Sequence, residues 1–247
     1  MDREERGAAI DEETQIISIA PKDFSFDASE AIVMDNTDNE NGMQSSQEVE
    51  ALLALALSLD KSGNYAEMLE VAQQVIDREP GSALALACKA RALQKLERLS
   101  EATIANDQAL LLDTNLPLAW LNRGGLQILQ ERYPEGLRST QRAIELAPQD
   151  ARAWANKGMA LLNLNNKFGA LEAMNQSLAC DPDYLFALQI KGEILRHYGR
   201  MHELVQTMRH ALELAPGDVN ALSLMIVASR ALEEYEDCLL YTSDAAD

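Results

Sequence analysis

The heptapeptide RAIELAP, residues 142–148, decides the fold because close variants of it recur along the chain. The variants are QVIDREP at 74–80, QALLLDT at 108–114, QSLACDP at 176–182 and HALELAP at 210–216. Successive copies begin 34 residues apart, and each ends in proline except the second, which ends in Thr114. A fixed period of this length indicates an array of similar supersecondary units.

The composition predicts that these units are helical. Aromatic residues make up only 5% of the 247 residues, and the chain has just 12 glycines and 7 prolines, whereas alanine and leucine are abundant. This balance favours helices over a turn-rich β architecture. Proline lacks a backbone N–H and disfavours helix in the residue before it, so each repeated proline marks the end of a helix.

The order of large and small side chains within each period resembles the tetratricopeptide repeat (TPR), in which W-x2-L-G-x2-Y is followed by A-x3-F and then by proline. The tryptophan position holds Leu52, Leu86, Trp120, Trp154, Leu188 and Leu222, and the glycine position holds Ala56, Ala90, Gly124, Gly158, Gly192 and Ile226. The resemblance implies an all-α, right-handed solenoid of antiparallel helix pairs, A and B, in which small residues let the two backbones approach closely. The units are expected at 49–82, 83–116, 117–150, 151–184 and 185–218, with a partial sixth at 219–237 that begins with a helix over 219–232.

Bulky residues replace small ones in three of these units. Met68 and Leu204 occupy the position of the family's later alanine, and Ile226 occupies that of its glycine. A larger side chain holds the paired backbones further apart. We therefore expect the first, fifth and sixth helix pairs to splay or shift.

The two ends of the chain differ from the repeats. Residues 1–50 contain 14 acidic and 3 basic side chains, and residues 35–46 are polar and without periodicity, so we expect 1–48 to be a flexible acidic leader. The last ten residues, CLLYTSDAAD, match one reading frame through a common sequencing adapter when they are back-translated. We expect 238–247 to be read-through and the natural protein to continue past residue 237, which makes this chain a fragment.

Charge and motif content narrow the class of function. The net charge of −19 argues against a nucleic-acid partner, which needs a basic surface. The N-terminus has no apolar signal segment, no stretch is long enough to span a membrane, and cysteines 88, 180 and 238 form no CxxC motif, which favours a cytoplasmic protein with reduced thiols. The sequence contains no phosphate-binding glycine loop, no GxSxG and no HExxH, so we expect neither an enzyme nor a cofactor or metal site.

The resemblance also implies a binding groove, because A helices line the concave face of TPR solenoids. The groove positions carry six Lys or Arg side chains (61, 91, 95, 152, 196 and 230) but only three acidic ones, Glu50, Asp60 and Glu193, which gives this surface a net charge of +3. Complementary potential steers and selects partners, so an acidic partner is favoured. The predicted peptide-binding residues are Arg91, Lys95, Asn122, Arg152, Asn156, Asn163, Arg196 and His197.

Three functional hypotheses follow from this groove. The first is a non-enzymatic scaffold that binds a peptide segment of a protein partner. The alternative is the docking or regulatory region of a larger truncated enzyme, such as a glycosyltransferase or kinase; Asn122 and Asn156 resemble two rungs of the asparagine ladder of O-linked N-acetylglucosamine transferases. In the third, the acidic leader folds back into the basic groove as an intramolecular competitor.

Overall fold

The computed structural model describes the backbone of residues 46–244 and the side chains of residues 46–233. Residues 1–45, and with them nearly all of the expected acidic leader, lie outside the described residues, as do residues 245–247 of the suspected read-through. Residues 46–244 contain helices and turns but no β-strand. No helix in this part of the chain combines the length and the apolar character needed to cross a bilayer.

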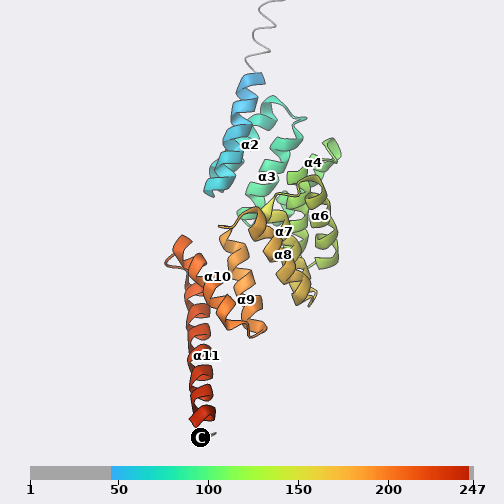
Figure 1. Ribbon diagram of the computed structural model, residues 1–247. Coiled ribbons are helices and arrows are strands. Elements are labelled where there is room, and N and C mark those ends of the chain that lie inside the picture. The colour runs from blue at the N-terminus through green and yellow to red at the C-terminus, as the bar shows by residue number, and fades with distance from the viewer. Residues whose placement is uncertain (1–45, 245–247) are drawn as a thin grey trace, which may run out of the picture. The chain divides into compact units, whose positions relative to one another are not determined.

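The helices alternate as A and B members of successive pairs (Figure 1). The A helices are residues 46–62, α3 (Ala83–Lys95), α5 (Pro117–Leu129), α7 (Ala151–Asn163) and α9 (Leu185–His197). The B helices are α2 (Tyr65–Arg78), α4 (Leu99–Leu112), α6 (Tyr133–Leu146), α8 (Lys167–Cys180) and α10 (Met201–Leu214), and α11 (Val219–Asp244) follows them. Each A helix from α3 to α9 packs on the B helix of its own pair and on the B helix of the preceding pair. The all-α stack of helix pairs predicted from the period is confirmed.

Side-chain caps begin several of these helices. The Ser82 hydroxyl accepts a hydrogen bond from the backbone N–H of Ala85 at 3.4 Å, and the Asp150 carboxylate accepts one from the N–H of Arg152 at 2.9 Å. Each such bond satisfies one of the N–H groups that a helix start leaves unpaired. The repeated prolines lie in the loops between one B helix and the next A helix, where the helix has already ended.

Small residues in the A helices allow close contact with the B helices. A Cβ atom added at Gly124 would lie 2.5 Å from Thr140 Cγ2, and one added at Gly158 would lie 2.6 Å from Met174 Cε. Trp120 and Trp154 pack beside these contacts, and their indole N–H groups donate to the carbonyls of Thr114 and Pro148 at 2.8 and 2.9 Å. The tryptophans therefore tie α5 and α7 to the loops that precede them.

The fifth pair, where Leu204 stands in place of a small residue, has a less extensive contact between its helices. Leu204 is fully buried, and α9 and α10 contact one another less extensively than the helices of the second, third and fourth pairs. The last helix departs further from the repeat, because α11 continues through residues 219–244 with no turn between an A and a B member. Ile226, at the glycine position, is 68% exposed and has no B helix to pack against.

The turn between the A and B helices has the same backbone conformation in each of the five pairs. One residue per turn has a positive φ, and these residues are spaced by the repeat period: Gly63, Glu97, Glu131, Asn165 and Gly199, with φ between 61° and 76°. This left-handed conformation suits glycine and, less well, asparagine, but it costs other residues about 1–2 kcal/mol. Glu97 and Glu131 are therefore strained.

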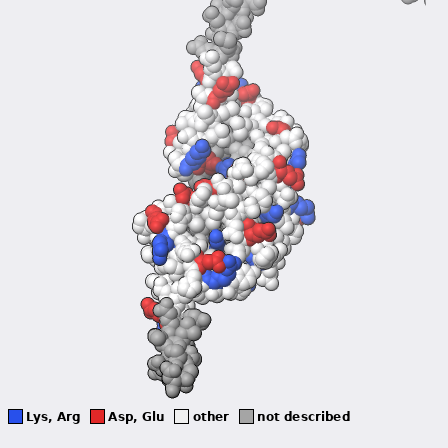
Figure 2. All heavy atoms as spheres, in the orientation of Figure 1, with Lys and Arg blue, Asp and Glu red and all other residues white. Residues whose placement is uncertain are grey.

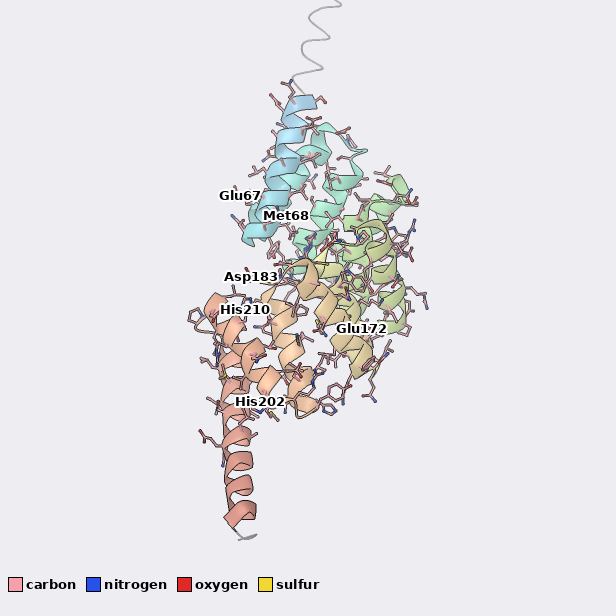
Figure 3. The ribbon with its side chains drawn as sticks, in the orientation of Figure 1. Glu67, Met68, Glu172, Asp183, His202 and His210 are labelled. Atoms are coloured by element: carbon pink, nitrogen blue, oxygen red, sulfur yellow. The ribbon has the colours of Figure 1, made fainter. Side chains whose placement is uncertain are left out.

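Replacing Glu97 or Glu131 with glycine is expected to raise the free energy of unfolding by about 0.5–1 kcal/mol each. The relief of left-handed strain exceeds the extra backbone entropy that glycine loses on folding. Urea denaturation followed by circular dichroism measures the change. The matched control is Glu172→Gly in the middle of α8 (Figure 3), which should cost about 1 kcal/mol. Destabilisation by all three substitutions would contradict the assignment of strain.

Candidate peptide-binding groove

The A helices and the loops that precede α7 and α9 surround a groove of about 1140 Å³. Its lining combines charged, amide, aromatic and aliphatic side chains: Leu57, Asp60, Lys61, Tyr65, Arg91, Gln94, Lys95, Gly125, Ile128, Leu129, Gln149, Asp150, Ala151, Arg152, Asn156, Met159, Asp181, Tyr184 and Phe186. These residues come from the first five helix pairs. A single concave surface therefore collects side chains that are up to 129 positions apart in the chain.

Four charged residues form a connected network in this groove, here called the Asp60 cluster: Asp60, Arg91, Asp150 and Arg152. The Asp60 carboxylate accepts a hydrogen bond from Arg91 Nε at 3.1 Å and another from Arg152 Nη1 at 2.8 Å. Arg152 also donates from Nε and Nη2 to the two carboxylate oxygens of Asp150, at 3.0 and 2.8 Å. Both carboxylates are thus held by charge-assisted hydrogen bonds, which are the strong ones.

Local structure explains how the cluster assembles. Asp60 lies in the last turn of helix 46–62 and Arg91 in α3, while Asp150 caps the start of α7, where Arg152 sits in the first turn. The curvature of the stack brings the end of the first A helix to the start of the fourth, so that Asp60 meets a residue 92 positions away. The side chain of Asp60 is only 8% exposed, against 34% for Arg152.

The cluster shifts the ionisation of its own members. Burial disfavours the charged carboxylate of Asp150, but hydrogen bonds and the positive charge of Arg152 outweigh it and hold the pKa of Asp150 below its usual value. Burial likewise opposes the charge on Arg152, yet Asp150 and Asp60 raise the pKa of the guanidinium. The charged forms of Asp150 and Arg152 are therefore favoured at neutral pH, and the two carboxylates of the cluster balance its two guanidinium groups.

This pairing corrects the expected excess of positive charge in the groove. Arg91 and Arg152 contribute two of the six predicted basic side chains, and both are already neutralised by internal carboxylates. On the face in view in Figure 2, basic and acidic side chains are likewise interspersed and form no continuous basic patch. The sequence-based count did not include Asp150, which lies in a loop rather than on an A-helix face.

Lys95 is a basic side chain of the groove that can meet a ligand anion. It is at the end of α3, makes no ion pair within the described residues, and holds its ammonium 5.9 Å from the centre of the Tyr65 ring. Partial burial, followed by the nearby charge of Arg91, lowers the pKa of Lys95. An anionic group placed beside Lys95 would relieve this repulsion.

Four of the eight predicted site residues line the groove: Arg91, Lys95, Arg152 and Asn156. Asn122 does not, because its side chain is 1% exposed and donates to the backbone carbonyl of Ala87 at 2.8 Å, which ties α5 to α3. A ladder of two ligand-binding asparagines is therefore not present. Asn163, Arg196 and His197 lie outside the groove lining, where they contact Met159, Glu193 and Lys167 respectively.

The structure adds groove residues that the A-helix positions did not identify. Gln149, Asp150, Asp181 and Tyr184 come from the loops that lead into α7 and α9. Burial raises the pKa of Tyr184, so its hydroxyl keeps its proton at neutral pH. The one sequence signal for this group is an acidic residue within two positions of a repeated proline, Asp150 after Pro148 and Asp181 before Pro182. Such a residue caps a helix as readily as it lines a groove.

The histidines lie at the end of α9 and on α10, and the buried Cys88 lies on α3. His210 Nε2 lies 2.9 Å from Asp183 at the surface, and His202 is elsewhere on α10 (Figure 3). Burial and then the charge of Asp60 raise the pKa of Cys88 to about 12, so its thiol stays protonated. Within residues 46–233, no group of three or more potential ligand side chains could hold a metal ion.

One segment of the chain matches a known protein family, and the whole fold is similar to that of solved structures. Residues 130–184 match the family model described as a tetratricopeptide repeat. The fold is similar to that of PilF from Pseudomonas aeruginosa, with a TM-score of 0.65 and 20% identity over 80% of this chain and 90% of that one. It is also similar to a thermophilic TPR protein from Thermus thermophilus, with a TM-score of 0.61 and 20% identity over 74% and 98% of the two chains.

A third similar structure is MamA, from residue 41 to its end, from Desulfovibrio magneticus RS-1, with a TM-score of 0.51 and 20% identity over 69% of this chain and 97% of that one. No curated protein matches this sequence. The three structural matches concern the fold, and the family model supplies the sequence evidence. Together with the period and the helix pairs, they show that the chain has the tetratricopeptide repeat fold and that residues 130–184 carry the sequence pattern of that family.

Proposed function

We propose that the chain is a non-enzymatic scaffold that binds a peptide segment of a protein partner in the groove. The observation that carries the proposal is the lining of the groove, which sets Lys95 and the amides of Gln94 and Asn156 beside the apolar surface of Met159 and Phe186. The surrounding helices are already formed, so a ligand pays little to order them. We also place the protein in the cytoplasm, where the free thiols of Cys88 and Cys180 remain reduced.

The structure favours a less acidic ligand than the sequence suggested. Since Asp60 and Asp150 already pair with the groove arginines, a strongly acidic peptide would have to displace them. A single carboxylate beside Lys95, flanked by apolar side chains that reach Ile128 and Leu129, suits the groove better. The autoinhibitory role of the acidic leader and the docking role in a larger enzyme stay predictions.

A random-peptide phage library panned against the full chain tests the proposal. Enriched peptides, synthesised with a fluorophore, should bind with an affinity that falls roughly tenfold or more for Lys95→Glu, because the substitution turns attraction for the ligand carboxylate into repulsion. The matched control is Lys157→Glu, which makes the same charge change at a lysine that contacts Gln141 and does not line the groove.

The outcome at the two lysines separates groove binding from non-specific attraction. Fluorescence anisotropy should report parental affinity for Lys157→Glu and weakened affinity for Lys95→Glu. Equal losses for both variants would indicate a general effect of net charge. Either that result or unchanged binding by Lys95→Glu would contradict a peptide site in this groove.

A further inference from the structure

A second pocket lies between α6 and α7 and shares no lining residue with the groove. Its volume is about 540 Å³, within the range of about 300–1,000 Å³ that ligand pockets have. Its lining is Leu137, Arg138, Gln141, Arg142, Glu145, Lys157 and Leu161. Because a helix turns by about 100° per residue, Lys157 lies on roughly the opposite side of α7 from the groove residues Arg152 and Met159. This α6–α7 pocket is therefore a separate surface.

The α6–α7 pocket is positively charged, although the whole chain carries −19. Arg138, Arg142 and Lys157 contribute three positive charges and Glu145 one negative charge, which leaves +2. Glu145 pairs with Arg142 at 3.1 Å. Arg138 is exposed and makes no hydrogen bond or ion pair with residues 46–233, and Lys157 makes no ion pair with them. One guanidinium and one ammonium group at the pocket are thus available to an anionic partner.

Two of these cations belong to α6 in particular and not to the repeat. Arg138 and Arg142 lie about one helical turn apart, and the equivalent positions of α2, α4, α8 and α10 carry no lysine or arginine. The residues there are Glu70, Gln74, Ile104, Gln108, Glu172, Gln176, Gln206 and His210. The packing of a helix pair therefore does not require a cation at either position.

The third cation lacks the carboxylate that its position in the repeat would supply. In the fifth repeat Lys191 is the equivalent of Lys157, and Glu203 lies near enough for the two charges to attract. The fourth repeat has Gly169 where the fifth has Glu203. The other repeats also carry glutamate at this position, as Glu67, Glu101 and Glu135. The fourth repeat thus leaves the charge of Lys157 uncompensated at the pocket.

We propose that the α6–α7 pocket binds an acidic peptide segment of a protein partner. One carboxylate pairs with the guanidinium of Arg138, whose fork of N–H groups matches it, and another pairs with Lys157. An apolar side chain of the same segment packs on Leu137 and Leu161, which are partly exposed. A nucleic acid or an anionic membrane would extend over the surrounding surface and meet the net charge of −19, whereas a short peptide covers the pocket alone. This inference does not depend on the proposed function of the groove.

A random-peptide phage library panned against the Lys95→Glu chain tests the pocket, because this variant disfavours binding in the groove. Enriched peptides should combine Asp or Glu with an apolar residue. Synthesised with a fluorophore, they should bind Arg138→Glu roughly tenfold more weakly than the parent. The matched control is Arg209→Glu: Arg209 is exposed on α10, makes no ion pair with residues 46–233 and lines neither pocket. It should bind as the parent does.

These measurements can also contradict the proposal. Peptides without acidic residues, no enriched peptide at all, or equal affinities of the parent and Arg138→Glu would each overturn it. An equal loss in Arg209→Glu would trace binding to net charge and would overturn it as well. Peptides of the pocket bind Lys95→Glu as they bind the parent, which separates them from peptides of the groove.

Gly169→Glu restores the carboxylate that the fourth repeat lacks, and it should weaken peptide binding roughly fivefold by pairing with Lys157. The matched control, Gly169→Gln, adds a side chain of the same size without the charge. A Cβ at this position would lie 2.9 Å from Asn166 Nδ2, and Asn166 caps α8, so both variants disturb that cap equally. Gly169→Gln should therefore bind at least about threefold more tightly than Gly169→Glu. Equal affinities of the two variants would show that the charge of Lys157 does not hold the peptide, and would overturn the inference.

Discussion

The Asp60→Asn variant is expected to unfold with a free energy about 3 kcal/mol lower than that of the parent. Asp60 is only 8% exposed and receives Arg91 and Arg152, whose side chains are 14% and 34% exposed. Removing one partner of a buried ion pair typically costs about 3–5 kcal/mol, because the remaining charges stay desolvated. The lower end applies here because Arg152 keeps Asp150 and is partly hydrated.

Urea denaturation of the full chain measures this loss. Asp107→Asn is the matched control: Asp107 is exposed on α4, so its neutralisation should change stability by less than about 0.5 kcal/mol. A double-mutant cycle with Arg152→Gln isolates the contact between the first and fourth helix pairs, and we expect a coupling of about 1–3 kcal/mol. Equal stability of Asp60→Asn and Asp107→Asn would show that the Asp60 cluster is structurally unimportant.

The fold could be predicted from the sequence because its determinants are local. A proline at the 34-residue period follows four of the five B helices, and the small residues at 90, 124, 158 and 192 specify where an A helix meets its B helix. Such patterns describe a unit and its nearest neighbour, which is all that a repeat needs in order to stack. The same reasoning identified Lys95 and Asn156 as groove residues, because they occupy the inward face of an A helix.

The charges of the groove could not be predicted in the same way. The contact between Asp60 and Arg152 depends on the small rotation accumulated over three repeats, and no pattern within one repeat encodes it. Asn122 and Asn156 occupy equivalent positions, yet one is fully buried by its neighbours and the other lines the groove. The sequence also could not predict that the side-chain oxygen of Gln94 is buried without a hydrogen bond. A position on a helix face does not indicate which partners a polar side chain finds.

The second large effect is the loss of stability expected for Gly124→Ala, because α5 and α6 approach closely at this glycine. Gly124→Ala places a Cβ 2.5 Å from Thr140 Cγ2 and 3.2 Å from the Thr140 backbone nitrogen. Thr140 is fully buried and β-branched, and its hydroxyl donates to the carbonyl of Leu137 at 3.0 Å, so it cannot turn away. Helix α6 must shift instead. Overpacking of this kind costs about 1–3 kcal/mol, and we expect a net loss of about 2 kcal/mol despite the better helix propensity of alanine.

Gly192→Ala is the control that tests this reasoning, because it makes the same substitution at the equivalent position of the fifth repeat. Its Cβ would meet Met208 Cε at 2.5 Å and Sδ at 3.0 Å, which form the end of an unbranched side chain that can move. The gain in helix propensity, about 1 kcal/mol, then offsets the cost of repacking, so this variant should lie within about 1 kcal/mol of the parent. Urea denaturation of both variants gives the comparison. If the two alanines were equally destabilising, the cost would come from the loss of glycine itself. Only a large difference between them shows that the stiffness of the facing side chain sets how closely two helices of a repeat can pack.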